Sequence, residues 1–88
     1  MDKTILVDKE SKGRMFVEKL KLRPDHSGVM DTENDLFYFV LSGYGLMNVE
    51  AYGYNLEQET GVFVPKDSRY TFKNTGEVDL VLVCYGVK

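Results

Sequence analysis

The chain has 88 residues, of which 43% are hydrophobic and 28% charged, and eleven basic and fourteen acidic side chains give it a net charge of −3. This composition is typical of a globular domain and excludes disordered and collagen-like structure. The negative charge would repel a phosphate backbone, so we expect no nucleic-acid partner. No apolar stretch is long enough to span a membrane and no secretory leader follows Met1, so we expect a cytoplasmic protein without a membrane partner.

Turn-forming residues recur about every ten residues, which is the spacing of a chain of short strands. The turn signals are Gly13, Pro24, Asn34, Tyr44, Gly53, Lys66 and Thr75. Segments rich in β-branched and aromatic residues, which favour strands, lie between them. These segments are 15–17, 36–41, 61–64, 70–72 and 78–85. The sequence therefore predicts an all-β fold of about eight strands, organised as one domain over residues 1–88.

Alternation predicts which side chains face the core. Leu20 and Leu22 share one face of their segment, and Tyr38 and Val40 share one face of theirs. Cys84 is the single cysteine and has no basic neighbour in the sequence to lower its pKa. We therefore expect Cys84 to be a small buried hydrophobic residue.

Two segments, 37–41 and 80–85, are apolar at nearly every position, so both of their faces must be covered. A small barrel has only one interior, and another surface must therefore cover the outer face. We expect that surface to belong to a second copy of the chain, in a homodimer paired through 80–85. The alternative is that the long loop 24–35 folds over the outer face.

The second half of the chain carries a motif. Pro65, Asp67, Tyr70 and Asn74 stand at the spacing of the pattern Pro-x-Gly-x-x-His-x-x-x-Asn, with Asp67 at its glycine and Tyr70 at its histidine. This pattern resembles the second motif of the cupins, a superfamily of small β-barrel proteins. Gly61 corresponds to the glycine that opens that motif.

Two upstream stretches are similar to other cupin segments. The stretch from Leu36 to Gly43 resembles the glutamate-strand-glycine part of the first cupin motif, with Leu36 in place of glutamate. Leu22-Arg23-Pro24-Asp25 resembles the hydrophobic-x-Pro-Gly segment. The resemblance covers about residues 15 to 86 and implies a cupin-like double-stranded β-helix, a jelly-roll barrel.

Cupins commonly hold a divalent ion with three histidines and one glutamate. The matching positions here are Val29 or Met30, Asp31 or Thr32, Leu36 and Tyr70. At most one of the four is an ordinary ligand, so the resemblance implies a cupin that has lost its metal, and we expect no cofactor. His26 is expected to be a solvated loop residue. We expect the same of the acidic cluster Asp31, Glu33 and Asp35.

The aromatic residues provide the candidate binding sites. A Tyr70 hydroxyl inside the barrel needs a hydrogen-bond partner. Either apolar side chains, including Val29, fill the interior, or the interior forms a pocket for a small polar ligand. The interior candidates are Tyr38, Tyr70, Phe72, Met30 and Leu36. The rim candidates for contact with a carbohydrate, a carboxylate or a protein are Tyr44, Tyr52, Tyr54, Lys66 and Arg69.

We expect a non-catalytic binding or dimerisation module and assign no catalytic residue. Residues 64–70 are similar to the C-terminal domain of centromere protein C, a degenerate cupin that pairs chains, although this likeness is short. The alternative is a small-molecule-binding cupin or a metal-independent sugar isomerase or epimerase. That enzyme would need Tyr38 or Tyr70 to work with Glu50 or Asp31 as an acid and base pair.

Overall fold

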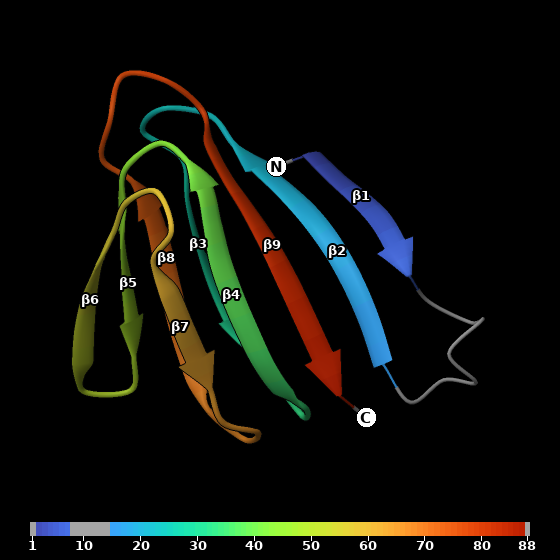
Figure 1. The fold of residues 1–88 in the computed structure, drawn as a ribbon. Helices are drawn as coiled ribbons and strands as arrows, with labels where there is room; N and C mark the ends of the chain where they lie inside the picture. The colour runs from blue at the N-terminus through green and yellow to red at the C-terminus, as the bar shows by residue number, and fades with distance from the viewer. Residues whose placement is uncertain (1, 8–14, 88) are drawn as a thin grey trace.

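The computed structural model describes residues 2–7 and 15–87. Within these ranges the chain forms nine strands in two sheets (Figure 1). The strands are β1 (Asp2–Val7), β2 (Met15–Leu22), β3 (Ser27–Asp31), β4 (Asp35–Ser42), β5 (Gly45–Val49), β6 (Tyr52–Leu56), β7 (Gly61–Val64), β8 (Arg69–Asn74) and β9 (Leu80–Val87). The five-stranded sheet has the order β1-β2-β9-β4-β7 and the four-stranded sheet the order β3-β8-β5-β6. The predicted all-β jelly roll is confirmed.

The chain crosses repeatedly between the sheets, so strands distant in sequence become neighbours. The last strand, β9, lies between β2 and β4, and β8 lies between β3 and β5, with every pairing antiparallel. One consequence is a row across the larger sheet in which Cys84 pairs with Glu18 on one side and with Tyr38 on the other.

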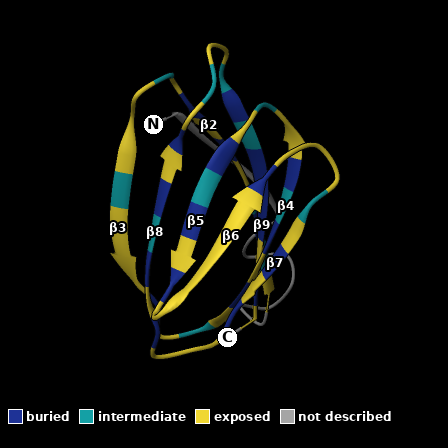
Figure 2. Ribbon diagram, turned by 90° about the vertical axis from the view of Figure 1, so that its left-hand side faces the viewer, coloured by how far each residue is buried: buried dark blue, intermediate teal, exposed yellow. Residues whose placement is uncertain are grey.

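The core lies between the two sheets and is built from alternate residues of the central strands. In β4, Leu36, Tyr38 and Val40 are buried, whereas Phe37 and Leu41 are exposed, as the alternation predicts. Figure 2 shows buried residues alternating along β5 and β8, while the edge strands β3 and β6 are mostly exposed. Because most side chains of β3 and β6 are exposed, these two strands carry a weak apolar pattern in the sequence.

Two turns depend on left-handed backbone conformations. Gly43 has a φ of 92°, and a Cβ there would lie 2.5 Å from the Asp79 carbonyl oxygen, so only glycine fits. Asp25 and Asp67, which stand where the cupin segments have glycine, have φ values of 64° and 63°. Aspartate tolerates this conformation better than most residues do, which explains how the turns persist without glycine.

Asn74 fastens the end of β8 to its surroundings. It is fully buried, and its Nδ2 donates to the carbonyl oxygens of Leu22 at 2.9 Å and Val78 at 2.7 Å. Its Oδ1 accepts a hydrogen bond from the Gly76 N–H at 2.8 Å. The asparagine of the cupin-like motif therefore holds together β2, β8 and the loop before β9.

The structure corrects several expectations about local structure. The chain has nine strands in its described parts, and one that the sequence did not reveal is β1, at an edge of the larger sheet. The segment 24–35 does not cover the outer face, since it contains β3, which pairs with β8 in the other sheet. The turn predicted at Gly13 lies outside the described residues. The described residues include no helix long and apolar enough to cross a membrane.

Candidate functional site

A hollow at one end of the sandwich, here called the mouth cavity, has a volume of about 170 Å³. It is lined by Phe16, Glu18, Met30, Asp31, Thr32, Asn34, Leu36, Tyr38, Tyr70 and Cys84. Four of the five interior candidates therefore line one cavity. The fifth, Phe72, lies deeper in the core, with its ring centroid 6.3 Å from that of Tyr70.

The base of the mouth cavity is a pair of tyrosines from opposite sheets. Tyr38 on β4 and Tyr70 on β8 are both only 2% exposed, and their hydroxyl oxygens lie 2.5 Å apart. Tyr70 Oη also donates to Met30 Sδ at 3.6 Å, an arrangement in which Tyr38 donates to Tyr70. Each buried phenol thus finds its partner in the protein, which satisfies the requirement for a buried hydroxyl.

The same burial keeps both phenols in their protonated form. Burial is the main cause that raises the pKa of Tyr38 above its ordinary value of 10.0, and Cys84 and Tyr70 raise it further. Burial also raises the pKa of Tyr70, and the hydrogen bond with Tyr38 partly offsets that rise. At neutral pH the two hydroxyls therefore remain protonated and act as hydrogen-bond groups.

Glu18 is a member of the cavity that the sequence reading missed. It pairs with Cys84 across β2 and β9, and it follows the inward phase of Leu20 and Leu22 on its strand. The alternation that placed the two leucines inside would also have placed Glu18 there. Cys84 is buried beside it, as predicted.

Asp31, which lines the mouth cavity, forms an ion pair with Arg69. The Arg69 guanidinium contacts Asp31 with an Nε to Oδ1 distance of 2.9 Å and an Nη2 to Oδ2 distance of 3.4 Å. The hydrogen bond from Arg69 lowers the pKa of Asp31, and the same pairing raises the pKa of Arg69. Asp31 is therefore a charged carboxylate that faces an arginine.

The side chains at the cupin metal positions do not fit a divalent ion. Leu36 has no donor atom, the Tyr70 phenol is protonated, and Thr32 Oγ1 exchanges hydrogen bonds with the backbone of Asn34. Met30 provides only a thioether, a ligand suited to soft ions. Among the described residues, no three His, Cys, Asp or Glu side chains form a group that could hold a metal ion.

The expectation that Val29 fills the interior is wrong. Val29 is 68% exposed because it pairs with Thr71 on the outer side of the smaller sheet. Met30, the next residue, takes the inward position opposite Tyr70, and it is itself partly exposed at the cavity edge. The tyrosine pair fills the centre of the barrel, and the mouth cavity remains above it.

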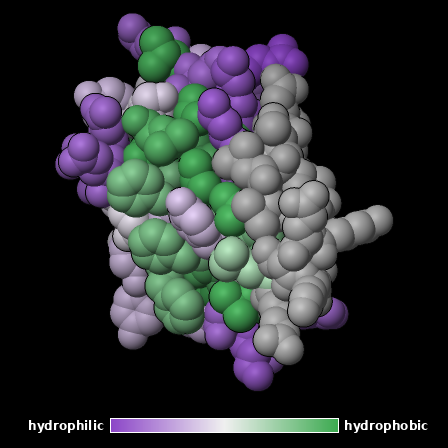
Figure 3. All heavy atoms as spheres, turned by 45° about the vertical axis from the view of Figure 1, so that its right-hand side comes forward, coloured by the Kyte–Doolittle hydropathy of each residue, from purple (hydrophilic) through white to green (hydrophobic). Residues whose placement is uncertain are grey.

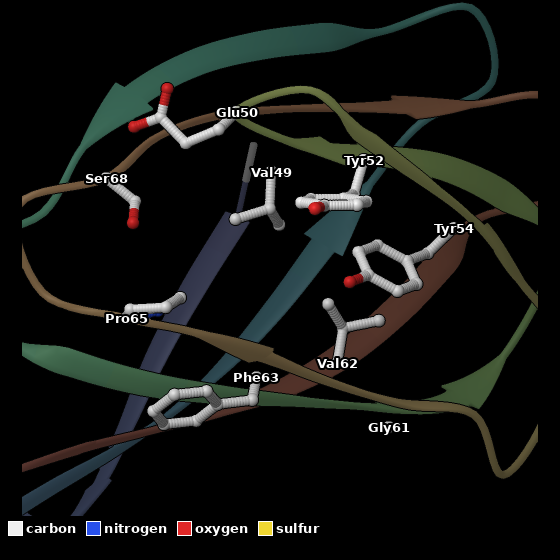
Figure 4. Close-up of a pocket in the computed structure, with 9 residues that line it drawn as sticks. All are labelled: Val49, Glu50, Tyr52, Tyr54, Gly61, Val62, Phe63, Pro65 and Ser68. Carbon is white, nitrogen blue, oxygen red and sulfur yellow. The ribbon is translucent and has the colours of Figure 1, made fainter.

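A second hollow, here called the seam groove, has a volume of about 380 Å³. It lies where the edge strands β6 and β7 of the two sheets run beside each other (Figure 4). Its lining residues are Val49, Glu50, Tyr52, Tyr54, Gly61, Val62, Phe63, Pro65 and Ser68. Tyr52 and Tyr54, predicted as loop residues of a rim, are therefore residues of strand β6 that line this groove.

The structure separates the other rim candidates. Tyr44 lies beside the end of β8, since its carbonyl oxygen accepts the Thr75 N–H at 3.2 Å. Lys66 and Arg69 lie near the start of β8, where the Lys66 N–H donates to Asp35 Oδ1 at 2.9 Å. The five residues therefore do not form one surface.

The histidine and the acidic cluster are not assembled into a site. His26 lies by the Tyr44 end of β8, because its carbonyl oxygen accepts the Asn74 N–H at 3.0 Å. Asp31 pairs with Arg69, and Asp35 caps the Lys66 N–H. His26 is thus at the opposite end of β8 from the mouth cavity.

No protein-family model and no curated protein matches the sequence. Solved structures match its fold. The cupin domain of Schizosaccharomyces pombe Cnp3 aligns over 98% of this chain and 59% of its own length, with a TM-score of 0.89 and 17% identity. This chain thus spans less than two thirds of that structure.

Two bacterial structures give a similar result. A predicted oxalate decarboxylase from Thermotoga maritima aligns over 97% of this chain and 77% of its own, with a TM-score of 0.88 and 20% identity. The Cupin_2 domain of an XRE family transcriptional regulator from Enterobacter cloacae aligns over 99% and 95%, with a TM-score of 0.88 and 13% identity. These matches confirm that the chain has the cupin fold, as the resemblance in its sequence implies.

Proposed function

We propose that this chain is a non-catalytic cupin-fold module that pairs with a second copy of itself through the outer face of its five-stranded sheet. The observation that carries the proposal is a row of three exposed rings across that face, here called the aromatic row. Phe37 on β4 pairs with Phe63 on β7 and with Tyr85 on β9, and the rings of Phe37 and Tyr85 are 6.3 Å apart. The three residues are 40%, 56% and 41% exposed, in the order Phe37, Phe63 and Tyr85.

Other apolar side chains extend the aromatic row into a patch. Leu41 is exposed on the same face, and Phe39, Val81 and Val83 lie between it and the row. Figure 3 shows hydrophobic side chains gathered over the middle of this face, with hydrophilic side chains above them, below them and to their left. Contiguous exposed apolar patches mark interaction surfaces, whereas single exposed apolar residues are ordinary.

A second copy of the chain is the partner that suits this patch. A two-fold axis brings the same surface of both chains together, so a patch without charge at its centre meets itself without repulsion. Among the residues whose side chains are described, Lys19 and Lys21 bring charge to this face from the neighbouring strand β2, where they pair with Val83 and Val81. Full burial of a fully exposed phenylalanine contributes about 1.5–3 kcal/mol, so rings that are about half exposed would contribute about 1 kcal/mol each to pairing.

The geometry of the mouth cavity supports the non-catalytic part of the proposal. The raised pKa values of Tyr38 and Tyr70 make them poor acid and base groups near neutral pH. Asp31 is tied to Arg69, and Glu50 lines the seam groove and not the mouth cavity. Of the pairs that a sugar isomerase would need, those with Glu50 are not brought together, and in those with Asp31 the carboxylate is held by Arg69.

Sedimentation equilibrium of the wild type, Phe37→Glu and Tyr44→Glu tests the pairing. Both variants replace an exposed aromatic residue by glutamate, but only Phe37 belongs to the aromatic row. We expect the wild type and Tyr44→Glu to be dimers and Phe37→Glu to be a folded monomer by circular dichroism. A wild-type monomer, or a dimer that survives Phe37→Glu, would refute the proposal.

The mouth cavity provides a second candidate function, the binding of a small polar ligand. Its volume of about 170 Å³ is below the range of about 300–1,000 Å³ that is typical of ligand pockets, so the ligand would have only a few non-hydrogen atoms. Glu18 and Asp31 in its lining disfavour a carboxylate ligand. NMR titration with glycerol and with acetate tests this candidate, and we expect glycerol alone to shift the signals of Tyr38 and Tyr70.

A further inference from the structure

One wall of the seam groove is aromatic, because two tyrosines lie on the edge strand β6. In β6, Tyr52 and Tyr54 have the same inward phase as Leu56, which is buried. The partner strand β5 ends at the turn between β5 and β6, and within the described residues no strand pairs with the other side of β6. The two tyrosines therefore point toward the space between the sheets but remain open to solvent.

The opposite wall is apolar and comes from β7. Val62 faces the groove from the core side, and Phe63 and Pro65 line it further along the chain. Figure 4 shows the rings of Tyr52 and Tyr54 next to each other and Val62 across from them. A ligand in the groove would thus lie between two phenol rings and an aliphatic surface.

One carboxylate lies at the end of the groove. Glu50 Oε1 accepts the Arg69 N–H at 2.9 Å, while the Glu50 N–H donates to the Arg69 carbonyl oxygen at 3.0 Å. These two hydrogen bonds fix the position of Glu50 in the turn between β5 and β6. Among the described residues that line the groove there is no lysine, arginine or histidine. The lining therefore carries one negative charge, which also interacts with the nearby Arg69 guanidinium outside the groove lining.

We infer that the seam groove binds a small organic cation, an alkylammonium with apolar groups around its nitrogen. The faces of aromatic rings attract cations, and the carboxylate attracts the same charge. The volume of about 380 Å³ lies within the range of small-molecule pockets. Glu50 would repel an anionic ligand, and the charge of Glu50 would add nothing to the binding of a neutral ligand.

This inference is separate from the proposed pairing. Only Phe63 belongs both to the seam groove and to the aromatic row. Variants at Glu50, Tyr52 and Tyr54 therefore test the groove and leave the aromatic row intact. A failure to bind cations would leave the pairing proposal unchanged, and a failure to pair would leave the cation-binding inference unchanged.

The test is an NMR titration of the full chain with choline, followed at the amides of β6 and β7. The matched probe is neohexanol, the uncharged carbon isostere of choline, and glucose serves as the carbohydrate probe. We expect choline to bind at least about fivefold more tightly than neohexanol, which corresponds to one exposed charge interaction. Glucose is expected to leave these amides unshifted.

Variants locate the binding. Glu50→Gln keeps an oxygen for the Arg69 N–H and removes the charge, so choline binding should weaken about fivefold while neohexanol binding stays unchanged. Tyr52→Ala and Tyr54→Ala should each weaken choline binding about two- to fivefold, and Tyr54→Phe should retain it because the ring remains. Tyr44→Ala, an exposed tyrosine outside the groove, is the control and should have no effect.

Any of four results would overturn the inference. Equal binding of choline and neohexanol would show that the charge has no role. Tighter binding of glucose would make the groove a carbohydrate site. Absence of choline binding, or binding that is unchanged in Glu50→Gln and Tyr54→Ala when both variants give folded spectra, would show that the groove does not bind organic cations.

Discussion

Tyr38 and Tyr70 connect the two sheets through a hydrogen bond of 2.5 Å between their hydroxyl oxygens. Their ring planes are inclined at 58° with centroids 5.6 Å apart, so the rings also pack against each other. This pair lies where the cupin-like motif has its histidine, at Tyr70, and it closes the base of the mouth cavity. A position that resembles a metal ligand in sequence thus contributes to the packing of the core.

Removal of one hydroxyl leaves the other without its main partner. We expect Tyr38→Phe to lower the free energy of unfolding by about 1–3 kcal/mol, and Tyr70→Phe to have a similar effect. The double variant should lose much less than the sum of the two, because neither unsatisfied hydroxyl then remains. Urea unfolding of the four proteins measures this coupling. Additive losses would show that the hydrogen bond does not link the two residues energetically.

Because of Tyr38, the free energy of unfolding should fall at alkaline pH. Its pKa is raised in the folded protein, mainly by burial, so its contribution is complete below the unfolded pKa of about 10 and is lost as the pH rises above it. One pH unit above that point, the loss should be about 1 kcal/mol. Urea midpoints measured across this range should fall less steeply for Tyr38→Phe than for the wild type. Equal slopes would contradict a raised pKa at Tyr38.

Asn74→Ala should be among the most damaging single polar substitutions. It removes three hydrogen bonds and leaves the buried Leu22 carbonyl without the Asn74 Nδ2 donor, so we expect a loss of about 3 kcal/mol. Asn48→Ala is the control, because exposed Asn48 makes only a long contact with Thr71 and should cost less than about 0.5 kcal/mol. Thermal unfolding compares the two. Similar losses would mean that the Asn74 network has little effect on stability.

The left-handed backbone at Asp67 makes opposite predictions for two substitutions. Asp67→Gly should preserve stability or raise it by up to about 1 kcal/mol, because glycine adopts a φ of 63° without strain. Asp67→Val should lower it by about 1–2 kcal/mol, since a β-branched residue is strained there. Denaturant midpoints measure both effects. A destabilising Asp67→Gly would instead assign a stabilising role to the aspartate side chain.

The sequence predicted the central strands better than the edge strands. The predicted segments 36–41 and 70–72 lie in the central strands β4 and β8, and most of 78–85 lies in β9. The edge strand β7 (Gly61–Val64) was also predicted, because Val62 and Val64 face the core. The edge strands β3 and β6 are largely exposed, so their sequences read as loops. Apolar periodicity reports burial, and β3 and β6 bury few of their side chains.

The sequence predicts the site residues whose position follows from alternation along a strand. It does not predict those that are brought together by the packing of the two sheets. Alternation and the cupin-like motif placed Tyr38 and Tyr70 in the interior, and the same alternation contained the signal for Glu18. The seam groove has no sequence signal, because it arises where Tyr54 on β6 and Val62 on β7 come together at an open edge. The sequence also does not show which loops lie close together, and for that reason Tyr44 is predicted in one rim with Lys66 and Arg69, which lie at the other end of β8.

The most direct test of the pairing is a search for intermolecular nuclear Overhauser effects in a sample that mixes isotope-labelled and unlabelled chains. The account predicts contacts from the rings of Phe37 and Tyr85 on one copy to the aromatic row of the other. Intermolecular contacts that arise only from another surface, or none at concentrations suited to NMR, would contradict it.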